Sequence, residues 1–324
     1  MTPHRSTPAV SVIIPAYKAA VDVPEALDSV FAQTFTHFEI ILVNDGSPDT
    51  LELEVAIARH RSHIRYIVQP NRGAGAARNA GIRAASGRYL AFLDADDLWA
   101  PDFLSRQTSY LEMHEQCALV YADAVISGES PLAGRRFTQN APSEGPVDLR
   151  SVIEQRCNVL MSTVVARRQA VVAAGLFDEA LRRGQDFDLW LRLALDGHEM
   201  AYQRDVLAFR RVRFSGLSGD TLSQLERAID VLERFGERHP LPYDARTALR
   251  CRLVRLLSER ELERAKLRLL EGNFAAARYH IEASQPKALR TRLALLGLRV
   301  TPQLVRRVYV ALRHPMPPRP ATVA

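Results

Sequence analysis

The first hundred residues alternate between two hydrophobic patterns, and this alternation restricts the fold more than any other feature. Short apolar runs, several of them rich in β-branched residues, are separated by segments in which apolar side chains recur at helical spacing. The apolar runs are Val10–Tyr17, Phe38–Val43, Ile64–Val68 and Tyr89–Leu93, and the helical segments are Val23–Thr34, Leu51–Arg61 and Ala74–Ala85. Apolar strands that alternate with helices form parallel sheets covered on both faces. The sequence therefore predicts an α/β fold.

The pattern changes twice beyond residue 100. Another helix and strand are expected over Asp102–Glu115 and Ala118–Ile126, before a stretch rich in Gly, Pro and Ser at Ser127–Pro146, which is either a functional loop or disordered. A helix over Asp186–Leu195 and an extended segment over Ala201–Val212 follow. The remainder is rich in Leu, Ala, Arg and Glu and is expected to be helical. We predict a flexible N-terminus at 1–8, an α/β domain at 9–219, a helical region at 220–314 and a disordered tail at 315–324.

Charge is distributed unevenly along the chain. From Arg246 to Ala324 there are 17 Lys and Arg against 5 Glu, a net charge of +12, whereas the preceding residues carry 26 basic and 32 acidic side chains, a net charge of −6. A basic region suits an anionic membrane surface or an acidic substrate. Nucleic acid is not expected as a partner, because aromatic residues do not interleave with the basic ones.

The cellular setting is expected to be the cytoplasm. No apolar run approaches the roughly 18–20 residues that cross a bilayer, and Met1–Pro8 lacks the apolar core of a secretory signal. The three cysteines form no CxxC pair and leave an odd one over, which is typical of a reducing compartment rather than of a disulfide framework.

Polar segments follow each of the first four predicted strands. They are Pro15–Tyr17, Asn44–Ser47, Asn71–Gly73 and Asp94–Asp97. Because open parallel sheets bind ligands outside the carboxyl ends of their strands, these segments are expected to share one edge. An aromatic ring, acidic side chains and a glycine turn there would suit a nucleotide. The classical nucleotide fingerprints are weak or missing: Gly73-Ala-Gly75 follows the third strand rather than the first, and no GxxxxGK[ST] motif occurs.

Two carboxylate clusters each allow two interpretations. Asp94, Asp96 and Asp97 would repel one another unless a cation compensates them, and Mg²⁺ or Mn²⁺ prefers such oxygen ligands. Alternatively, Asp97 caps a helix that begins at Leu98. Asp186 and Asp188 stand at the start of a predicted helix, where one of them could cap the helix or act as a general base. The residues alone favour the cap in this second cluster and leave the first one open.

Five segments in order resemble glycosyltransferase family 2, whose members are inverting enzymes with the GT-A nucleotide-diphosphosugar transferase fold. The segments are Val10–Tyr17, Val43–Ser47, Asn71–Gly81, Phe92–Asp97 and Gly184–Trp190. The resemblance extends over about residues 9–218. It implies a mixed, mainly parallel sheet between helices, to which the helical C-terminal region is appended.

The resemblance also implies roles for individual residues. The nucleotide-binding residues would be Pro15, Ala16, Tyr17, Asp45, Arg78, Asp94 and Ala95. Tyr17 would lie near the base, and Asp45 would accept a hydrogen bond from the base N3–H, which favours uracil or thymine. Asp94 and Asp96 match the DxD motif of the family, which holds Mn²⁺ or Mg²⁺, with Asp96 as the direct ligand.

The catalytic base is expected to be Asp186, which would deprotonate the acceptor hydroxyl for in-line attack on the anomeric carbon. Gln185 stands where relatives often have Glu, which leaves Asp188 as the alternative base. Arg211, Arg213 and Ser218 fall in a segment that can close over the diphosphate in this family. These residues are either ligands of the diphosphate or ordinary surface residues, and the sequence does not decide between the two.

The sequence therefore predicts a metal-dependent inverting glycosyltransferase, with a UDP-sugar as the favoured nucleotide-diphosphosugar donor. The acceptor would be a hydroxyl of a glycan or a lipid-linked molecule in cell-surface polysaccharide synthesis. A GT-A-like nucleotide-binding scaffold without turnover is the main alternative. A nucleotidyltransferase is disfavoured, because it would need a Gly-rich basic turn in place of Pro15–Tyr17. The amphipathic, basic helix around Leu304–Leu312 could contact the inner face of the plasma membrane or pack on the rest of the tail.

Overall fold

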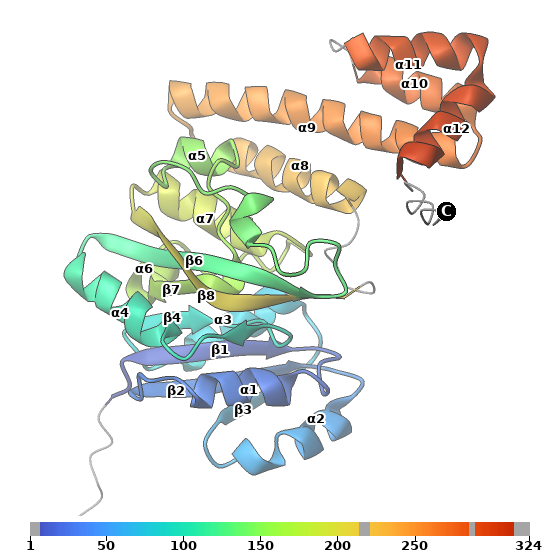
Figure 1. The fold of residues 1–324 in the computed structure, drawn as a ribbon. Coiled ribbons are helices and arrows are strands. Elements are labelled where there is room, and N and C mark those ends of the chain that lie inside the picture. The colour runs from blue at the N-terminus through green and yellow to red at the C-terminus, as the bar shows by residue number, and fades with distance from the viewer. Residues whose placement is uncertain (1–6, 214–220, 285–288, 314–324) are drawn as a thin grey trace, which may run out of the picture. The chain divides into compact units, whose positions relative to one another are not determined.

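The computed structural model describes residues 7–213, 221–284 and 289–313 of the chain (Figure 1). These residues form two compact units. The first, here called the sheet unit, comprises Met1–Gly219 and Val231–Leu249, and the second, the helical unit, comprises Asp220–Asp230 and Arg250–Ala324.

The sheet unit is built on one eight-stranded sheet with the order β3-β2-β1-β4-β7-β6-β8-β5. Its strands are β1 (Val10–Ala16), β2 (Phe38–Asp45), β3 (Arg65–Gln69), β4 (Tyr89–Phe92), β5 (Leu98–Trp99), β6 (Cys117–Gly128), β7 (Val164–Arg167) and β8 (Glu199–Val212). β3, β2, β1 and β4 are parallel neighbours, and so are β6 and β8. β7 joins the two groups by antiparallel pairing with β4 and β6, and β5 pairs antiparallel with β8. The predicted α/β fold with a mixed, mainly parallel sheet is confirmed.

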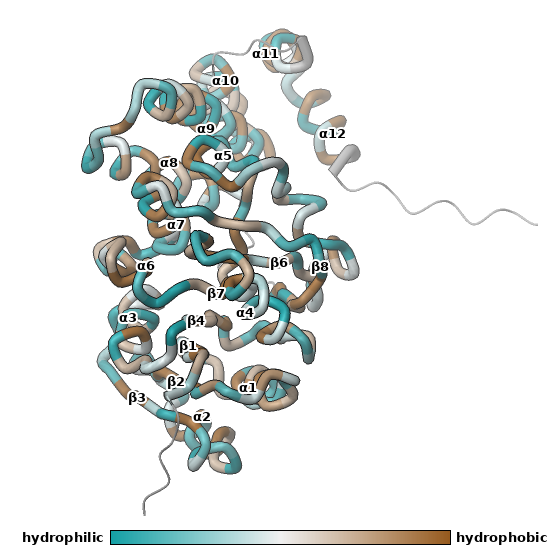
Figure 2. Tube along the Cα trace, turned by 90° about the vertical axis from the view of Figure 1, so that its left-hand side faces the viewer, coloured by the Kyte–Doolittle hydropathy of each residue, from teal (hydrophilic) through white to brown (hydrophobic). Residues whose placement is uncertain are grey.

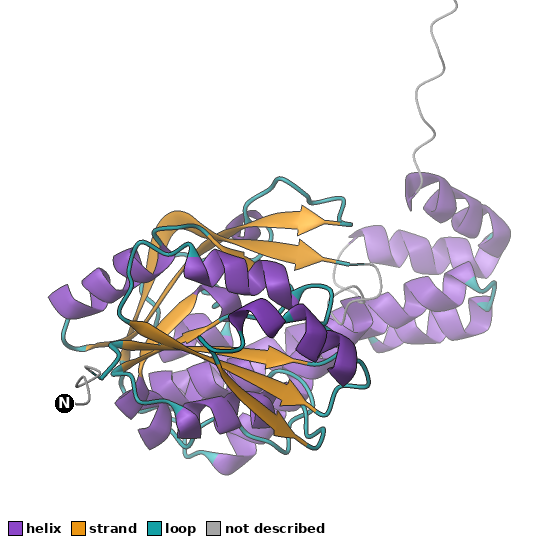
Figure 3. Cartoon of the chain, turned by 90° about the horizontal axis from the view of Figure 1, so that it is seen from below, coloured by secondary structure: helices purple, strands orange, loops and turns teal. Residues whose placement is uncertain are grey.

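Helices cover both faces of the sheet (Figure 3). They are α1 (Val23–Phe31), α2 (Thr50–Ala56), α3 (Ala74–Ala84), α4 (Phe103–Met113), α5 (Leu149–Ile153), α6 (Arg168–Ala173) and α7 (Gln185–Leu195). Along β1, Val10, Val12 and Ile14 belong to the core shared with α1 and α4, whereas Ile13 meets α3 on the opposite face. The approach to α3 is close: a Cβ atom on Gly81 would lie 2.6 Å from Ile13 Cγ2.

Several boundaries differ from the prediction. The helix expected over Leu51–Arg61 is α2 followed by a separate 3₁₀ turn at Ala58–His60. No helix begins at Leu98, because Leu98–Trp99 is the strand β5 and α4 begins only at Phe103. The interpretation of Asp97 as a helix cap is therefore wrong. β5 and β7 were not expected from the sequence.

The glycine- and serine-rich stretch after β6 is a defined loop in the structure. It contains a 3₁₀ turn at Phe137–Gln139 and is fastened to the sheet at Asp123, which is fully buried on β6. Thr138 Oγ1 donates a hydrogen bond of 2.6 Å to Asp123 Oδ2. This buried carboxylate therefore fixes the loop to the face of β6.

The helical unit packs around a small core of its own. Its helices α10 (Phe274–Ala283), α11 (Leu289–Val300) and α12 (Pro302–Arg313) follow α8 (Thr221–Arg238) and α9 (Tyr243–Leu270), which each contribute residues to both units. The buried core residues are Ala265, Leu269, Ala277, Ile281 and Leu298. Asn273 caps α10 by accepting a hydrogen bond from the Ala276 N–H. Within the residues that the structure describes, no helix has the length and hydrophobicity needed to span a bilayer.

Candidate active site at the carboxyl edge of the sheet

The strand order brings the predicted donor-site residues to one edge of the sheet. β3, β2, β1 and β4 run parallel and adjacent, so the residues that follow them lie side by side (Figure 1). Tyr17 follows β1, Asp45 ends β2, Gly73 precedes α3 and Asp94 follows β4. The register places Asp45 opposite Gln69 and Ala16 opposite Asn44.

Asp45 organises the loop between β3 and α3. Its side chain is buried, and Oδ1 accepts hydrogen bonds from Gln69 Nε2 at 2.7 Å and Arg72 N at 3.0 Å, while Oδ2 accepts one from Gly73 N at 2.7 Å. A carboxylate can accept about four hydrogen bonds. Asp45 therefore retains capacity for one further donor, such as a base N–H.

The turn after β2 requires glycine. Gly46 has φ +61°, and a Cβ atom there would lie 2.5 Å from the backbone nitrogen of Asn71. Both the left-handed conformation and the close approach of the β3–α3 loop exclude a side chain. This contact sets the distance between the turn after β2 and the β3–α3 loop, which both belong to the predicted nucleotide site.

Tyr17 is presented to solvent by a loop that hydrogen bonds hold in place. Its side chain is 48% exposed, whereas Ala16 is buried and Pro15 is partly buried. The backbone N–H of Lys18 donates to Ser47 Oγ at 2.7 Å, and that of Ala20 donates to Asp49 Oδ2 at 3.0 Å. An exposed ring on a fixed loop can stack on a flat ligand.

A cluster of carboxylates lies at the end of β4. Asp94 Oδ1 accepts a hydrogen bond of 2.5 Å from Arg78 Nη2, and the Asp94 N–H donates to Ser162 Oγ. Asp97 is buried and accepts hydrogen bonds from Ser162 Oγ at 2.5 Å and from Arg211 N at 2.8 Å. Burial and the negative charges of Asp94 and Asp96 raise the pKa of Asp97 to about 8. Asp97 thus connects the end of β8 and the turn at Ser162 to the cluster.

Asp96 is half-buried between these groups, and Ala95 beside it is buried. Burial raises the pKa of Asp96, and the neighbouring charges of Asp94 and Asp22 raise it further, whereas Arg213 lowers it. Negative charge therefore exceeds its local compensation, and a cation would relieve this excess.

The donor set fits a divalent cation that arrives with a diphosphate. Among the described residues, no three His, Cys, Asp or Glu side chains converge on one point. A closed protein cage is not needed, because Mg²⁺ is usually held by one or two carboxylates together with substrate phosphates and water. Asp96 and the second oxygen of Asp94 can supply those two ligands.

Arg78 is buried in the site and held from two sides. Besides donating to Asp94, its guanidinium lies 5.7 Å from the ring centroid of Phe177, and its Nε atom has no hydrogen-bond partner in the described part of the chain. Asn79 fixes Phe177 by donating to its carbonyl at 2.9 Å and accepting from its N–H at 3.0 Å. α3 therefore contributes Arg78 itself and also Asn79, which holds the loop whose Phe177 ring lies against Arg78.

The structure distinguishes the two carboxylates of α7. Asp188 is buried and paired with Arg192, with 2.8 Å between Oδ2 and Nη2, and Arg192 also donates to the carbonyls of Ala174 and Leu176. Asp186 is half-buried, and its side chain makes no hydrogen bond or ion pair with any described residue. Neither is the helix cap, because Gly184 occupies that position with φ +77°. The capping interpretation of this pair is wrong.

The start of α7 adjoins the start of α3. Gln185 is buried, and its Cγ atom lies 3.1 Å from the position of a Cβ atom on Gly75. Its Nε2 atom donates to the Leu181 carbonyl at 2.7 Å. Asp186, the next residue, therefore belongs to the same edge of the sheet unit as the β3–α3 loop.

The arginines at the end of β8 pair with the start of α1. Arg211 donates to Asp22 at 3.0 Å and to Glu25 at 2.6 Å, and Arg213 also pairs with Asp22. Ser218 lies outside the described residues. Asp22 and Ser162 were missed in the sequence analysis. Asp22 precedes Val23 as an acidic residue before a helix and resembles an ordinary cap, and Ser162 carries no signal at all.

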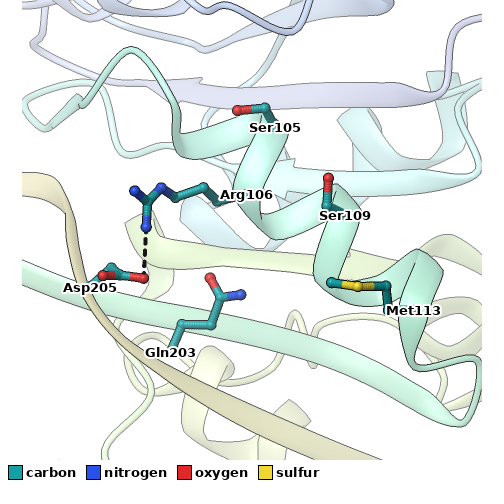
Figure 4. Close-up of a pocket in the computed structure, with 6 residues that line it drawn as sticks. All are labelled: Ser105, Arg106, Ser109, Met113, Gln203 and Asp205. Carbon is teal, nitrogen blue, oxygen red and sulfur yellow. Dashed lines mark hydrogen bonds and ion pairs between the residues drawn. The ribbon is translucent and has the colours of Figure 1, made fainter.

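Two pockets lie elsewhere on the sheet unit. The first, about 310 Å³, is formed by α4 and β8, and its lining includes the ion pair between Arg106 and Asp205 at 2.9 Å (Figure 4). The second, about 300 Å³, is lined by the loop after β6 and by Tyr202 and Arg204. Neither contains a residue of the predicted donor site.

Comparison with known proteins agrees with this geometry. The family model described as glycosyl transferase family 2 matches residues 11–157. An uncharacterized glycosyltransferase of Rickettsia typhi is 30% identical over 233 residues, which cover 70% of this chain and 71% of the relative. UDP-Glc:alpha-D-GlcNAc-diphosphoundecaprenol beta-1,3-glucosyltransferase WfgD of Escherichia coli is 27% identical over 230 residues, or 70% of this chain and 87% of WfgD.

A solved structure has the same fold. Mannosyltransferase PcManGT from Pyrobaculum calidifontis, in complex with GDP-Man and Mn²⁺, superimposes with a TM-score of 0.60 at 18% identity, over 95% of this chain and 86% of PcManGT. The fold of the sheet unit is therefore that of the GT-A glycosyltransferases. Together with the sequence match to the Rickettsia typhi protein, these observations identify the chain as a member of glycosyl transferase family 2.

Proposed function

We propose that this glycosyltransferase transfers a sugar from a UDP-sugar to a hydroxyl of a lipid-linked or glycan acceptor, with inversion at the anomeric carbon. The proposal rests on the different environments of four carboxylates at one edge of the sheet. Asp45 retains one acceptor position, Asp94 has one oxygen that Arg78 does not use, burial and neighbouring carboxylates raise the pKa of Asp96, and the Asp186 side chain has no partner among the described residues.

The donor would lie along the ends of β2, β1 and β4. Tyr17 would stack on the base, with Pro15 and Ala16 beside the nucleoside, and Asp45 would accept the N3–H of uracil. Arg78 would lie beside the diphosphate near Asp94 and Ala95. Arg211 and Arg213 are two further cations at this edge, and exchanging Asp22 for phosphate would let them bind the diphosphate bidentately.

A divalent cation, Mn²⁺ or Mg²⁺, would be held by Asp96 and Asp94. When bound there, it supplies positive charge that stabilises the diphosphate as it leaves. PcManGT, a protein of the same fold, binds Mn²⁺ together with its nucleotide sugar. The excess of negative charge around Asp96 supports the same use of a metal in this chain.

The transfer itself needs one base and one leaving group. Asp186 would accept the proton of the acceptor hydroxyl as its oxygen attacks the anomeric carbon. The bond between that carbon and the diphosphate oxygen breaks on the opposite side, and UDP leaves with the electron pair. One in-line displacement inverts the anomeric configuration. Asp188 cannot share this role, because Arg192 holds it inside the protein.

The acceptor class is proposed from the relative WfgD, whose name specifies UDP-glucose as donor and a diphosphoundecaprenol-linked sugar as acceptor. An acceptor of this kind is embedded in a membrane, so the enzyme would act from the cytoplasm at the inner face of the plasma membrane, in cell-surface polysaccharide synthesis.

Isothermal titration calorimetry with UDP, with and without Mn²⁺, tests the donor site. We expect wild-type protein to bind UDP in a Mn²⁺-dependent manner, and Asp96→Ala to weaken that binding at least about tenfold, because one of two metal ligands is lost. Asp205→Ala, which removes an exposed carboxylate from the separate pocket of α4 and β8, is the matched control and should bind like wild type. Failure of UDP, dTDP, GDP and CDP alike to bind would refute the proposal.

A further inference from the structure

The last two helices of the helical unit carry apolar side chains that the fold leaves in solvent. On α11, Leu293, Leu296 and Val300 are 56%, 58% and 71% exposed. On α12, Leu304 and Val308 are 57% and 50% exposed. These five residues are here called the exposed stripe. Figure 2 shows brown, hydrophobic segments along both helices.

The exposed stripe is distinct from the side of each helix that packs into the core. On α11 the core side carries Ala294, Leu295 and Leu298, and on α12 it carries Val305 and Tyr309. At about 100° per residue, Leu293, Leu296 and Val300 fall on the side of α11 opposite Ala294 and Leu298. α11 is therefore apolar on two sides, of which the core uses only one.

The two halves of the stripe meet at a tight corner. A Cβ atom on Gly297 would lie 2.7 Å from Val305 Cγ2, so α11 and α12 approach closely where Thr301 joins them. On its other side α12 is fastened to the end of α9 by Arg306, which donates to the Leu270 carbonyl at 2.8 Å. The α11 half of the stripe thus lies opposite the core side of its helix, and the α12 half lies about 100° round its helix from Val305 and Tyr309.

The charged side chains of α11 and α12 themselves are all basic, although Arg299 pairs with Glu282 of α10 at 3.0 Å. Residues 283–324 contain no Asp or Glu, and their basic residues are Lys287, Arg290, Arg292, Arg299, Arg306, Arg307, Arg313 and Arg319. Arg307 adjoins Val308 and is exposed, with no ion pair to a described residue. Aliphatic side chains edged by arginine suit the boundary between acyl chains and anionic headgroups.

We propose that α11 and α12 dock on an anionic lipid bilayer, with the exposed stripe inserted at the headgroup boundary and Arg307 paired with a lipid phosphate. An interface with a second copy of the chain through these helices is disfavoured, because it would bring two strongly basic surfaces together and neither α11 nor α12 contains an acidic residue. The purpose of docking rests on the proposed function, since it would hold the enzyme at the surface that contains a lipid-linked acceptor. The docking itself needs no donor and can be measured without one.

The test is sedimentation of the full-length protein with vesicles of phosphatidylcholine or of an equal mixture of phosphatidylcholine and phosphatidylglycerol. We expect binding at least about tenfold tighter to the anionic vesicles, and weaker binding as salt is raised. Leu296→Glu combined with Leu304→Glu should reduce binding to that seen with neutral vesicles. Arg307→Glu should weaken it about tenfold, because it replaces a positive with a negative charge.

Val254→Glu is the matched control, since Val254 is an exposed aliphatic residue of the helical unit outside the stripe and should bind like wild type. Circular dichroism and UDP titration of each variant establish that the fold and the donor site are intact, so failure of docking is distinguishable from failure of the donor site. Equal binding of wild type and the double variant, or no binding to anionic vesicles, would overturn the proposal. A dimer in light scattering that the double variant abolishes would assign the stripe to a second copy instead.

Discussion

At the scale of single residues, Gly46 shows how closely the backbone around the donor site is determined. We predict that Gly46→Ala destabilises the protein by at least about 3 kcal/mol, since it combines left-handed strain with a clash against backbone that cannot move aside. Its UDP affinity should fall as well, because the clash displaces the β3–α3 loop. Denaturant unfolding and UDP titration measure the two effects.

Gly134→Ala is the control for this prediction. Gly134 has φ +82°, but a Cβ atom there would meet nothing within 4 Å. The substitution should cost only the conformational strain, about 1 kcal/mol, and leave UDP binding unchanged. Equal losses of stability in the two variants would show that contact with Asn71 is unimportant.

The choice between Asp186 and Asp188 shows where residue-level sequence analysis ends. Both carboxylates stand in the first turn of one helix, and their spacing gives them equal claims to be cap or base. They differ because Asp188 pairs with Arg192, which is itself held by the carbonyls of Ala174 and Leu176. Such a contact depends on tertiary structure, which local spacing does not encode. Ser162 went unnoticed for the same reason.

At the scale of elements, long periodic segments were predicted well and short ones were missed. β1 to β4 and α3 were located to within a few residues, because continuous apolar runs and helical spacing persist over enough positions to be recognised. β7 and β5 have only four and two residues, and their extended form depends on neighbours that are distant in sequence. The parallel core of the fold was therefore predictable, and the antiparallel strands that join and end the sheet were not.

The contact of α3 with the loop before α7 gives a pH prediction. Hydrogen bonding from Asn79 and the charges of Arg83 and Arg72 hold the pKa of Glu179 below its usual value, against a smaller opposing effect of burial. A carboxylate with a depressed folded-state pKa stabilises the protein above its unfolded value near 4.5, and this contribution is lost as pH falls through the folded-state value.

Glu179→Gln should therefore cost about 1–2 kcal/mol at neutral pH and progressively less below about pH 4. Urea unfolding of wild type and variant across this range measures the difference. Glu112→Gln, which changes an exposed carboxylate on α4, is the control and should follow the wild-type profile at every pH. A cost for Glu179→Gln that does not depend on pH would contradict the assigned contacts.

At the scale of the whole molecule, the division into units bears on where the catalytic domain ends. Val231, Leu232 and Phe235 on α8 are fully buried, and their segment belongs to the sheet unit. Arg238 in the same segment pairs with Asp178 at 2.5 Å. We therefore propose that the catalytic domain extends to about residue 249 rather than ending at residue 219.

Truncation tests this boundary. A chain ending at residue 219 loses Val231, Leu232 and Phe235 among other buried apolar side chains, and these three are each worth about 1.5–3 kcal/mol. It should be poorly soluble or unfold at much lower temperature. A chain ending at residue 249 should unfold cooperatively and bind UDP. Equal thermal stability of the two truncated proteins would place the boundary back at residue 219.

The central claim is that Asp186 is the base of a UDP-sugar transferase, and the most direct measurement is turnover of a panel of UDP-sugars by wild type, Asp186→Asn and Asp188→Asn. We predict that Asp186→Asn binds UDP like wild type but turns over roughly 10²–10⁴-fold more slowly, because the acceptor proton has no base. Asp188→Asn should keep its turnover per folded molecule and lose stability, because the charge of Arg192 is left unpaired. Wild-type turnover in Asp186→Asn, with loss of turnover in stably folded Asp188→Asn, would contradict the assignment.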